Sequence, residues 1–368
     1  MLRKTALHDS HVALGAKMGA FAGYDMPLFY PDGVMKEHEW TRSHAGIFDV
    51  SHMGQAIIEG TGVVEFLEKI TPSPFQAKKN GRAQYTVLTN EDGGIVDDLI
   101  ITRLEEKKFF IVFNAGCKEK DIAWIKKNLP ITVHLHPLAD QSLIALQGRW
   151  AERIVFEIFE YDAKDLGYMC LAEIAAPDGT PCYLSRLGYT GEDGFEISVP
   201  DDIAPDIWDR LIRHSEARPI GLAARDSLRL EMGYPLYGHD IDDTTSPVEA
   251  GLQWIIGKSN TGFIGAARVL NEMKNGTARQ RVGLKLLDPG VAREGAEIRS
   301  AQDQVIGKLT SGGFSPSLKQ SIGMGYVESS AAKTGQRLFV HVRGKNLQAE
   351  IVDLPFMQPK TKSMKKAA

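Results

Sequence analysis

Two adjacent carboxylates, Asp97 and Asp98, follow a pair of glycines and lie inside an apolar run. β-Branched and aromatic residues on both sides of the turn predict a hairpin with arms at residues 83–89 and 95–103. Successive strand side chains point to opposite faces, so each carboxylate has apolar neighbours on its own face. It must find a hydrogen-bond partner, change its pKa or open onto a cleft, where it can hold or exchange a proton.

Tyr85 is the polar aromatic residue nearest to these acids across the predicted hairpin. Folding the hairpin about its turn places Tyr85 roughly opposite Asp98, within one residue of register. A phenol and a carboxylate on one patch indicate a polar site. The spacing alone favours a simpler interpretation, in which one aspartate faces solvent and the other closes the turn by accepting backbone N–H bonds.

Three further segments combine glycines with polar and aromatic side chains, at residues 49–54, 185–196 and 221–231. In the second, seven residues with three glycines interrupt two predicted strands. These glycines either let the backbone approach a ligand closely or make a wide turn. In the third, Arg225 and Arg229 lie one helical turn apart, and surface ion pairs are the simpler interpretation of their spacing.

The elements that position these residues can be read from periodicity. Helical spacing predicts helices at residues 34–45, 63–70, 119–129, 149–159, 203–214, 222–232 and 266–273. Alternating runs predict strands at residues 109–113, 131–136, 143–146, 169–174, 181–187 and 195–199. Residues 13–31 mix glycine, proline and aromatics, which predicts a packed extended segment.

The C-terminal quarter has a different pattern. Residues 274–277 form a polar linker, and short strand-like runs follow at 281–287, 305–311, 323–328, 336–342 and 347–352. Gly-containing turns separate these runs, which predicts a small all-β domain. Residues 360–368 are basic and contain no core, which predicts a solvated, disordered end.

Composition sets the broad class. A chain of 368 residues is long enough for two or three domains, and its hydrophobic fraction of 43% is ordinary for a globular protein. The net charge of -4 gives no electrostatic reason to expect nucleic-acid binding. Three cysteines without paired spacing fit a reducing compartment, and no apolar run is long enough for a membrane span. We expect a cytoplasmic protein, or a mitochondrial matrix enzyme written without its targeting segment.

Several familiar catalytic motifs do not occur. The chain has no G-x-G-x-x-G, H-E-x-x-H or G-x-S-x-G sequence. His134 and His136 share a predicted strand face, but no third ligand has diagnostic spacing, so no metal site is predicted.

The polar and aromatic segments, taken in order, resemble the aminomethyltransferase of the glycine cleavage system, the T-protein family. The resemblance rests on FAGYDMP at residues 21–27, FDVSHMG at 48–54, GGIVDDL at 93–99, GYTGEDGFE at 188–196, GLAARDSLRLE at 221–231 and LTSGGFSP at 309–316. It covers most of the chain, and the order and spacing of the motifs are more specific than any one of them.

The resemblance implies an α+β fold with three domains around a central folate cavity. The first is ferredoxin-like and comprises residues 1–50 and 140–250, and the second, at residues 51–139, is an α+β domain intertwined with it. Residues 251–277 would be a connecting helix and linker. Residues 278–368 would form a C-terminal all-β, barrel-like domain.

The resemblance also implies the reaction and its participants. Members of this family transfer the methylene of an aminomethyl group, carried on the lipoyl arm of H-protein, to tetrahydrofolate. The products are 5,10-methylenetetrahydrofolate, ammonia and the dihydrolipoyl carrier. Tetrahydrofolate is therefore the expected co-substrate and lipoylated H-protein the expected partner, with no nucleic acid or membrane involved.

Site residues follow from the motifs. Asp98 would be the critical acid, which holds the folate nitrogens and stabilises developing positive charge; Asp97 keeps a structural interpretation. Glu196 would bind the donor N–H groups of the pterin. The other expected folate-binding residues are Met53, Tyr85, Asn114, Tyr168, Tyr189, Arg225 and Tyr234.

One departure from the family and two alternatives remain. The basic residue expected after Pro355-Phe356 is displaced, so that Lys360 or Lys362 would take its place near the folate tail or the lipoyl carrier. A non-catalytic folate-binding protein of iron–sulfur assembly would carry Lys-Gly-Cys, whereas residues 260–265 here contain no cysteine. A related folate-dependent demethylase is harder to separate by sequence.

Overall fold

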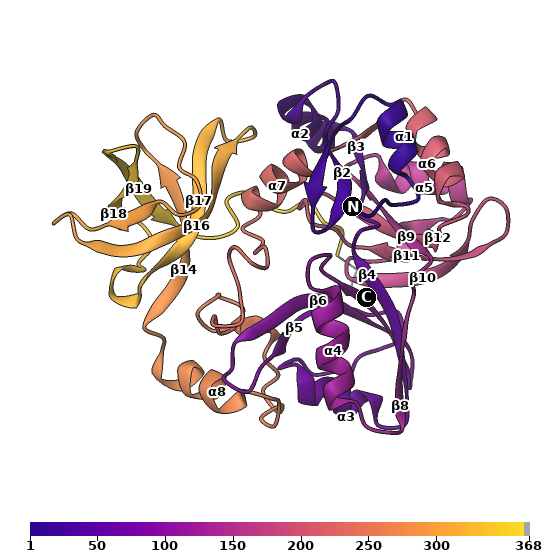
Figure 1. Ribbon diagram of the computed structural model, residues 1–368, viewed down its shortest axis with the longest axis horizontal. Helices are drawn as coiled ribbons and strands as arrows, with labels where there is room; N and C mark the ends of the chain where they lie inside the picture. Colours follow the sequence, from indigo (N-terminus) through magenta and orange to yellow (C-terminus); the bar gives the residue numbers. More distant parts are fainter. Residues whose placement is uncertain (364–368) are drawn as a thin grey trace.

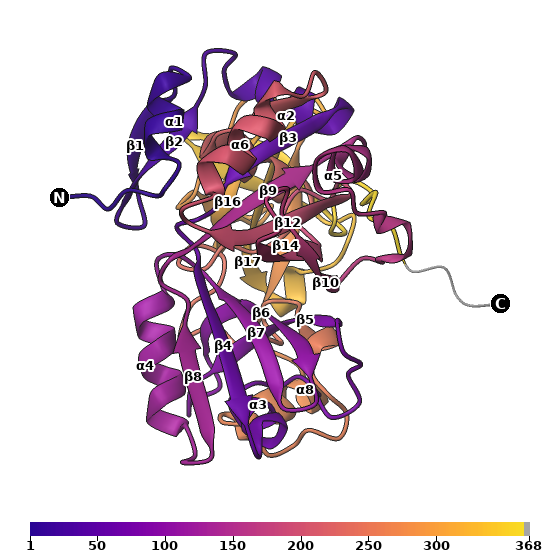
Figure 2. The same ribbon diagram turned by 90° about the vertical axis from the view of Figure 1, so that its right-hand side faces the viewer.

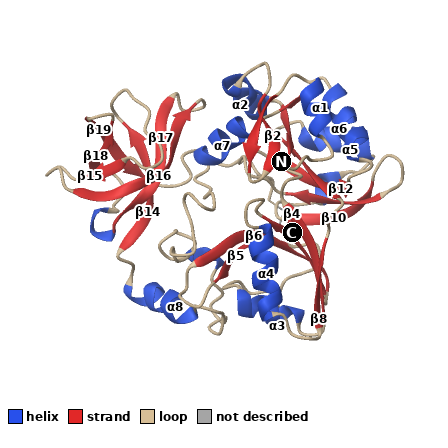
Figure 3. Cartoon of the chain, in the orientation of Figure 1, coloured by secondary structure: helices blue, strands red, loops and turns tan. Residues whose placement is uncertain are grey.

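The computed structural model describes residues 1–363 and builds them around three main sheets (Figures 1 and 3). The first has six strands in the order β10-β11-β12-β9-β3-β13. Their bounds are β3 (Ala45–Asp49), β9 (Gln141–Gln147), β10 (Cys170–Ala175), β11 (Pro181–Arg186), β12 (Gly194–Pro200) and β13 (Ala217–Pro219).

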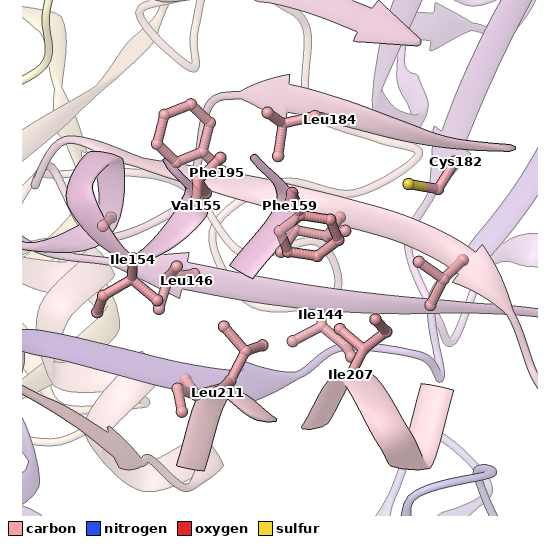
Figure 4. Packing of buried hydrophobic residues seen from close by; sticks show 14 of the residues in the cluster. Ile144, Leu146, Ile154, Val155, Phe159, Cys182, Leu184, Phe195, Ile207 and Leu211 are labelled. Atoms are coloured by element: carbon pink, nitrogen blue, oxygen red, sulfur yellow. The ribbon is translucent and has the colours of Figure 1, made fainter. Parts of the chain in front are cut away.

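Two amphipathic helices, α5 (Ala151–Phe159) and α6 (Ala204–Arg213), cover the six-stranded sheet. Their apolar faces pack on inward-facing strand residues such as Leu146 and Phe195 (Figure 4). Trp208 of α6 is fully buried in this cluster. Burial of so many large side chains makes this body a rigid support for the loops at its edge.

The second sheet has five strands in the order β5-β6-β7-β4-β8 and lies at the lower right in Figure 1. Its strands are β4 (Gly54–Gly60), β5 (Ala83–Thr89), β6 (Ile95–Glu105), β7 (Lys108–Phe113) and β8 (Val133–Pro137), and its helices are α3 (Val63–Ile70) and α4 (Lys118–Asn128). The chain leaves the first sheet after β3, completes the second, and returns to the first at β9. The two α+β bodies are thus intertwined.

A hairpin and three helices flank these bodies. The segment predicted to be extended is a two-stranded antiparallel sheet of β1 (Lys17–Phe21) and β2 (Tyr24–Phe29), preceded by α1 (His8–Ala13), which the sequence pattern did not predict. Helix α2 (Val34–Ser43) packs against α7 (Leu222–Glu231), and α7 also contacts β2 and the C-terminal domain. Helix α7 therefore sits where the bodies meet (Figure 1).

The C-terminal domain is a closed barrel in the order β14-β17-β16-β15-β18-β19, which confirms the predicted all-β, barrel-like unit of an α+β fold. Helix α8 (Ala266–Asn275) leads into it, and its strands are β14 (Arg279–Leu286), β15 (Glu297–Arg299), β16 (Val305–Ser315), β17 (Gln320–Glu328), β18 (Arg337–Val342) and β19 (Lys345–Val352). Strand β15 was not predicted because three residues carry too little alternation. Single 3₁₀ turns are η1 (Ala163–Asp165), η2 (Gln253–Ile255) and η3 (Ser329–Ala331).

The end of the chain does not match the predicted disordered tail. After the barrel the backbone runs back to the six-stranded sheet (Figure 2), where Lys360 N donates to Gly191 O at 2.7 Å and Lys362 O accepts from Tyr168 N at 2.7 Å. Residues 364–368, also part of that prediction, lie outside the described residues. No helix in residues 1–363 is both long and apolar enough to cross a membrane.

The predicted domain boundaries remain a prediction, and the hydrophobic clusters show how the packed bodies are built. One hydrophobic cluster joins the helices and strands of the six-stranded sheet, a second joins those of the five-stranded sheet, and a third fills the barrel. A further cluster links the first two bodies through Phe48 and Phe110. The two α+β bodies therefore share packed side chains as well as two chain crossings.

Candidate active site

A cavity of about 1450 Å³ lies where the two α+β bodies, α7 and the barrel meet. Its lining includes side chains from the β5–β6 hairpin, from the loop between β11 and β12, and from Thr310 and Ser311 of the barrel. All nine site residues expected from the sequence line this one cavity: Met53, Tyr85, Asp98, Asn114, Tyr168, Tyr189, Glu196, Arg225 and Tyr234. The fold thus brings together residues that are as much as 181 positions apart in the chain.

The turn before β6 is built by Asn90. Its side-chain Oδ1 accepts hydrogen bonds from Asp92 N at 3.0 Å and Gly94 N at 2.8 Å, as expected for asparagine in a turn. Gly93 has φ +76°, a conformation that glycine adopts readily. A Cβ at Gly94 would lie 1.7 Å from Asp243 O, so only glycine fits this close approach. These constraints fix where β6 begins and therefore where its acids lie.

The register of the hairpin differs from the predicted one. Tyr85 is paired with Ile100 and Asp98 with Val87, and a β-bulge between Leu88 and Thr89 accounts for one of the two residues of difference. Tyr85 and Asp98 are therefore diagonal neighbours on one face of the sheet. The phenol still reaches the acid, and Tyr85 OH donates to Asp98 Oδ2 at 2.9 Å.

Asn114, immediately after β7, joins the two acids. Its Nδ2 donates to Asp98 Oδ1 at 2.7 Å and to Asp97 Oδ1 at 3.1 Å, and its backbone N–H donates to Asp97 Oδ2 at 3.3 Å. Asp97 is fully buried, and Asp98 opens only onto the cavity. The simpler interpretation from spacing was wrong, because neither aspartate faces bulk solvent and neither closes the turn.

The Asp98 carboxyl has an unusual proton affinity. Burial, and next the nearby charge of Asp97, raise the pKa of Asp98 to about 7, while hydrogen bonds from Tyr85 and Asn114 oppose the increase. A carboxyl whose pKa lies near neutrality can hold or release a proton at physiological pH. Asp98 therefore suits both acid–base chemistry and stabilisation of a developing cation.

Stacked aromatic rings form two walls of the cavity. The rings of Tyr189 and Tyr234 lie 5.7 Å apart at 24°, and those of Tyr85 and Trp254 lie 5.7 Å apart at 21°. Such surfaces bind flat, conjugated ligands. Trp254 was not predicted; it is 66% exposed and follows no catalytic motif, so only its exposure in the fold reveals it.

Glu196 and Arg225 carry opposite charges in the same cavity. Burial raises the pKa of Glu196, and the charge of Arg225 opposes that increase; burial lowers the pKa of Arg225. The Arg225 guanidinium lies 4.8 Å from the centre of the Tyr189 ring, and its Nη1 is buried without a hydrogen-bond partner among residues 1–363. A buried guanidinium donor without a partner is suited to an acidic or carbonyl group of a ligand.

Surface ion pairs, the simpler interpretation, are wrong for Arg225 and only partly right for Arg229, whose Nε donates to the exposed Asp226 Oδ1 at 2.7 Å. Arg225 turns into the cavity, and Arg229 is 3% exposed, with its Nη1 donating to Asp240 Oδ2 at 2.7 Å and its Nη2 to Ser311 Oγ at 2.9 Å. Arg229 thereby links α7 to the barrel.

His52 is a second cavity residue that the sequence did not single out, although its motif was recognised. Its side chain is 2% exposed and burial lowers its pKa to about 4, so the imidazole is neutral near pH 7. The Phe21 ring lies 5.5 Å away in an edge-to-face arrangement. His52 thus adds a neutral polar group to an otherwise aromatic wall.

Lys360 and Lys362, considered as substitutes for the family's basic residue, do not line the cavity. Lys360 Nζ pairs with Glu192 Oε1 at 3.0 Å, and Lys362 Nζ pairs with Glu152 Oε2 at 2.9 Å. Both charges are engaged by acids of the six-stranded body, so these lysines anchor the tail to it.

Comparison with known proteins decides the family. The model of the "GCVT N-terminal domain" matches residues 7–260, and that of the "Glycine cleavage T-protein C-terminal barrel domain" matches residues 279–358. The chain belongs to the glycine cleavage T-protein family. Its members include a mitochondrial aminomethyltransferase of Flaveria trinervia, 42% identical over 98% of this chain and 90% of that protein. A mitochondrial aminomethyltransferase of Dictyostelium discoideum is 42% identical over 99% of this chain and 94% of that protein.

The T-protein fold is equally well matched. The crystal structure of the glycine cleavage system aminomethyltransferase T from Bartonella henselae superposes with a TM-score of 0.93 and 39% identity, over 99% of this chain and 100% of that chain. This T-protein is an enzyme, an aminomethyltransferase of the glycine cleavage system. The cavity described above is its candidate active site.

Proposed function

We propose that this T-protein transfers the methylene of an aminomethyl group, held on the lipoyl arm of H-protein, to tetrahydrofolate. The products would be 5,10-methylenetetrahydrofolate, ammonia and the dihydrolipoyl carrier. The observation that carries the proposal is Asp98, a carboxyl with a pKa near 7 that Tyr85 and Asn114 hold at the wall of the central cavity. Family membership alone supports the class of reaction. The geometry of the cavity supports the roles that we give to individual residues.

The cavity fits a folate in its chemistry. Stacked pairs of rings, Tyr189 with Tyr234 and Tyr85 with Trp254, suit a pterin and a benzoyl ring, with Met53 and Tyr168 completing the wall. Glu196 would accept from the pterin N–H groups, and the unpartnered Nη1 of Arg225 would donate to an anionic or carbonyl group. When bound, tetrahydrofolate would supply the amine nitrogens that receive the one-carbon unit.

The cavity also has room for a second substrate. Pockets for one drug-sized molecule have volumes of roughly 300–1,000 Å³, whereas this cavity measures about 1450 Å³. The remaining space supports entry of a flexible arm bearing the aminomethyl group. Lipoylated H-protein is therefore the partner that we propose.

Asp98 would act at the meeting point of the two substrates. As a carboxylate it would stabilise the positive charge that develops on the transferred carbon, because a fixed negative charge at the wall of a cavity acts more strongly than one in bulk water. With a pKa of about 7 it can also accept a proton from a folate nitrogen and return it. Tyr85 and Asn114 fix its orientation.

A single assay tests the proposal. Purified T-protein is incubated with lipoylated H-protein in the reduced form, ammonia and 5,10-methylenetetrahydrofolate, and formation of aminomethylated H-protein is measured. We expect turnover that depends on every component. Absence of turnover by folded protein, together with demethylation of an N-methyl amino acid in the presence of tetrahydrofolate, would instead favour the related demethylase.

The relatives support a proposal for the cellular location. The aminomethyltransferases of Flaveria and Dictyostelium are mitochondrial by name, and the structural relative from Bartonella is bacterial. We propose the cytoplasm for a bacterial chain and the mitochondrial matrix for a eukaryotic one. Fractionation followed by immunodetection would distinguish these compartments from any other.

A further inference from the structure

A third acid, Asp121 of α4, lies behind the two acids of β6. Strand alternation turns Asp98 toward the cavity and Asp97 toward α4, where Asp97 and Asp121 are both fully buried. Neither carboxyl oxygen of Asp121 has a hydrogen-bond partner in an N–H or O–H group of residues 1–363. Its nearest acidic neighbour is Asp97, since each of the two carboxyls changes the pKa of the other. Two neighbouring carboxyl groups, both fully buried, are too costly as two anions, so one of them must keep a proton.

The chemistry assigns that proton mainly to Asp121. Burial raises the pKa of Asp97, but the two hydrogen bonds that it accepts from Asn114, together with the neighbouring Cys117 thiol, oppose this increase and favour the ionised form. Asp121 has no such donors, and burial, followed by the charge of Asp97, raises its pKa to about 10. As a neutral acid, Asp121 donates to Asp97, and Asp97 remains an anion beside Asp98.

We propose that Asp97 and Asp121 hold one buried proton between them, and that this acid pair is a positioning unit for Asp98. It acts through the Asn114 amide, which donates to both Asp97 and Asp98. It also acts through charge, because an ionised Asp97 makes Asp98 bind a proton more tightly. The inference rests on the proposed role of Asp98 in the reaction and adds two residues that never touch a substrate.

The other groups around the pair are consistent with this arrangement. The ammonium group of Lys120 in α4 donates hydrogen bonds to Val96 O and to Tyr237 OH. The charge of Lys120 lowers the pKa of Asp121, but burial raises this pKa by more. Cys117 stays a thiol, because burial and the charge of Asp97 raise its pKa. Within residues 1–363, the pair thus lies near the Lys120 ammonium, the neutral Cys117 thiol and the Tyr237 phenol, besides Asn114 and Asp98.

Two substitutions at Asp121 separate a proton-sharing role from simple packing. Asp121→Asn keeps a donor to Asp97, so we expect the pH midpoint of kcat/KM to stay within about 0.3 units of the wild type. Asp121→Leu removes the donor and favours protonation of Asp97 itself. The midpoint should then move to lower pH by about one unit, since a like charge beside Asp98 is lost. Glu119→Gln, an exposed change on the same helix, serves as the control.

An infrared difference measurement gives a readout that does not depend on turnover. At about pH 8, where Asp98 is ionised and Asp121 is not, the wild type should show a protonated-carboxyl band that Asp121→Asn lacks. No difference in this band, or equal pH midpoints for Asp121→Leu and the wild type, would overturn the inference. If Asp98→Asn kept full turnover while the infrared band behaved as expected, the proposed role of Asp98 would fail and the shared proton would stand.

Discussion

The hydroxyl of Tyr85 donates to Asp98 Oδ2 at 2.9 Å although the two residues are not cross-strand partners. Their diagonal arrangement follows in part from the β-bulge at Leu88/Thr89. It leaves the second oxygen of Asp98 to the Asn114 amide, so that both oxygens are oriented. The acid is therefore held from strand β5 and from the first residue after strand β7 of the same sheet.

Removal of this phenol should change the working pH of the enzyme. In Tyr85→Phe, the carboxylate loses a hydrogen bond of about 1.5–3 kcal/mol. Because this bond lowers the pKa of Asp98, the pKa should rise by about one to two units. The acid limb of the kcat/KM profile would move to higher pH, as measured across a buffer series. Tyr183→Phe, outside the cavity, is the control, and an unchanged profile would count against the contact.

Loss of the Asp98 carboxyl should reduce turnover much more than it reduces tetrahydrofolate binding. Asp98→Asn should keep tetrahydrofolate affinity within about tenfold, or about 1.4 kcal/mol, while turnover decreases by about a hundredfold or more. Isothermal calorimetry gives the affinity, and the H-protein assay gives the rate. A larger loss of turnover in Asp97→Asn than in Asp98→Asn would show that the cavity-facing acid has been assigned wrongly.

Stability should depend on pH through the same carboxyl. The folded state raises the pKa of Asp98 from its ordinary value near 4 to about 7, so it binds this proton more tightly than the unfolded chain does. The resulting stabilisation is fully present below about pH 4 and is lost as pH rises through 7. In urea unfolding between pH 5 and 8, Asp98→Asn should lose less stability than the wild type. Parallel curves would contradict the raised pKa.

Arg225 should contribute to folate affinity more than to the chemical step. Arg225→Gln removes the buried Nη1 that lacks a protein partner, so the Kd for tetrahydrofolate should increase by about tenfold or more, with kcat within about threefold. Arg213→Gln, an exposed change on α6, is the control. Equal affinities for Arg225→Gln and the wild type would show that this guanidinium does not bind the ligand.

The link between α7 and the barrel should be a large contribution to stability. Asp240 is buried and accepts from Arg229, Thr310 and Ser311. Asp240→Ala leaves the Arg229 charge buried without this partner and should lower the free energy of unfolding by about 3–5 kcal/mol. Asp226→Ala removes the exposed partner of the same arginine and should cost less than about 1 kcal/mol. Similar losses in the two variants would contradict a buried ionic link.

Local sequence patterns predict the helices and turns of this fold, because these elements depend mainly on residues that are close together in the chain. The helix predicted at residues 63–70 is α3, and the turn at Asn90 forms as its side-chain chemistry requires. The register of β5 and β6 was two residues off. The bulge that leaves Val96 unpaired accounts for one of these residues, because hydrophobic alternation does not show where a ladder breaks.

The cavity itself depends on contacts between distant segments. Trp254 reaches it from the linker after α7, and His52 reaches it from the turn after β3. Trp254 lies in no recognised motif, and the motif that contains His52 does not distinguish it from its neighbours, because what matters is which surface the tertiary structure leaves open. The predicted residues were identified by their motifs, whereas these two could be identified only from the folded structure. The same holds for Asp121, since an acidic residue in a helix is ordinarily exposed to solvent.

The tail from Phe356 to Lys362 has a consequence for biosynthesis. Two of its backbone hydrogen bonds join it to Gly191 and Tyr168, in segments that wall the cavity. Because domains fold in order as the chain is made, both sheets and the barrel can form while this wall still lacks its last support. The binding site is therefore completed only after residue 362 has been synthesised. A nascent or prematurely terminated chain would have the whole scaffold and an unfinished pocket.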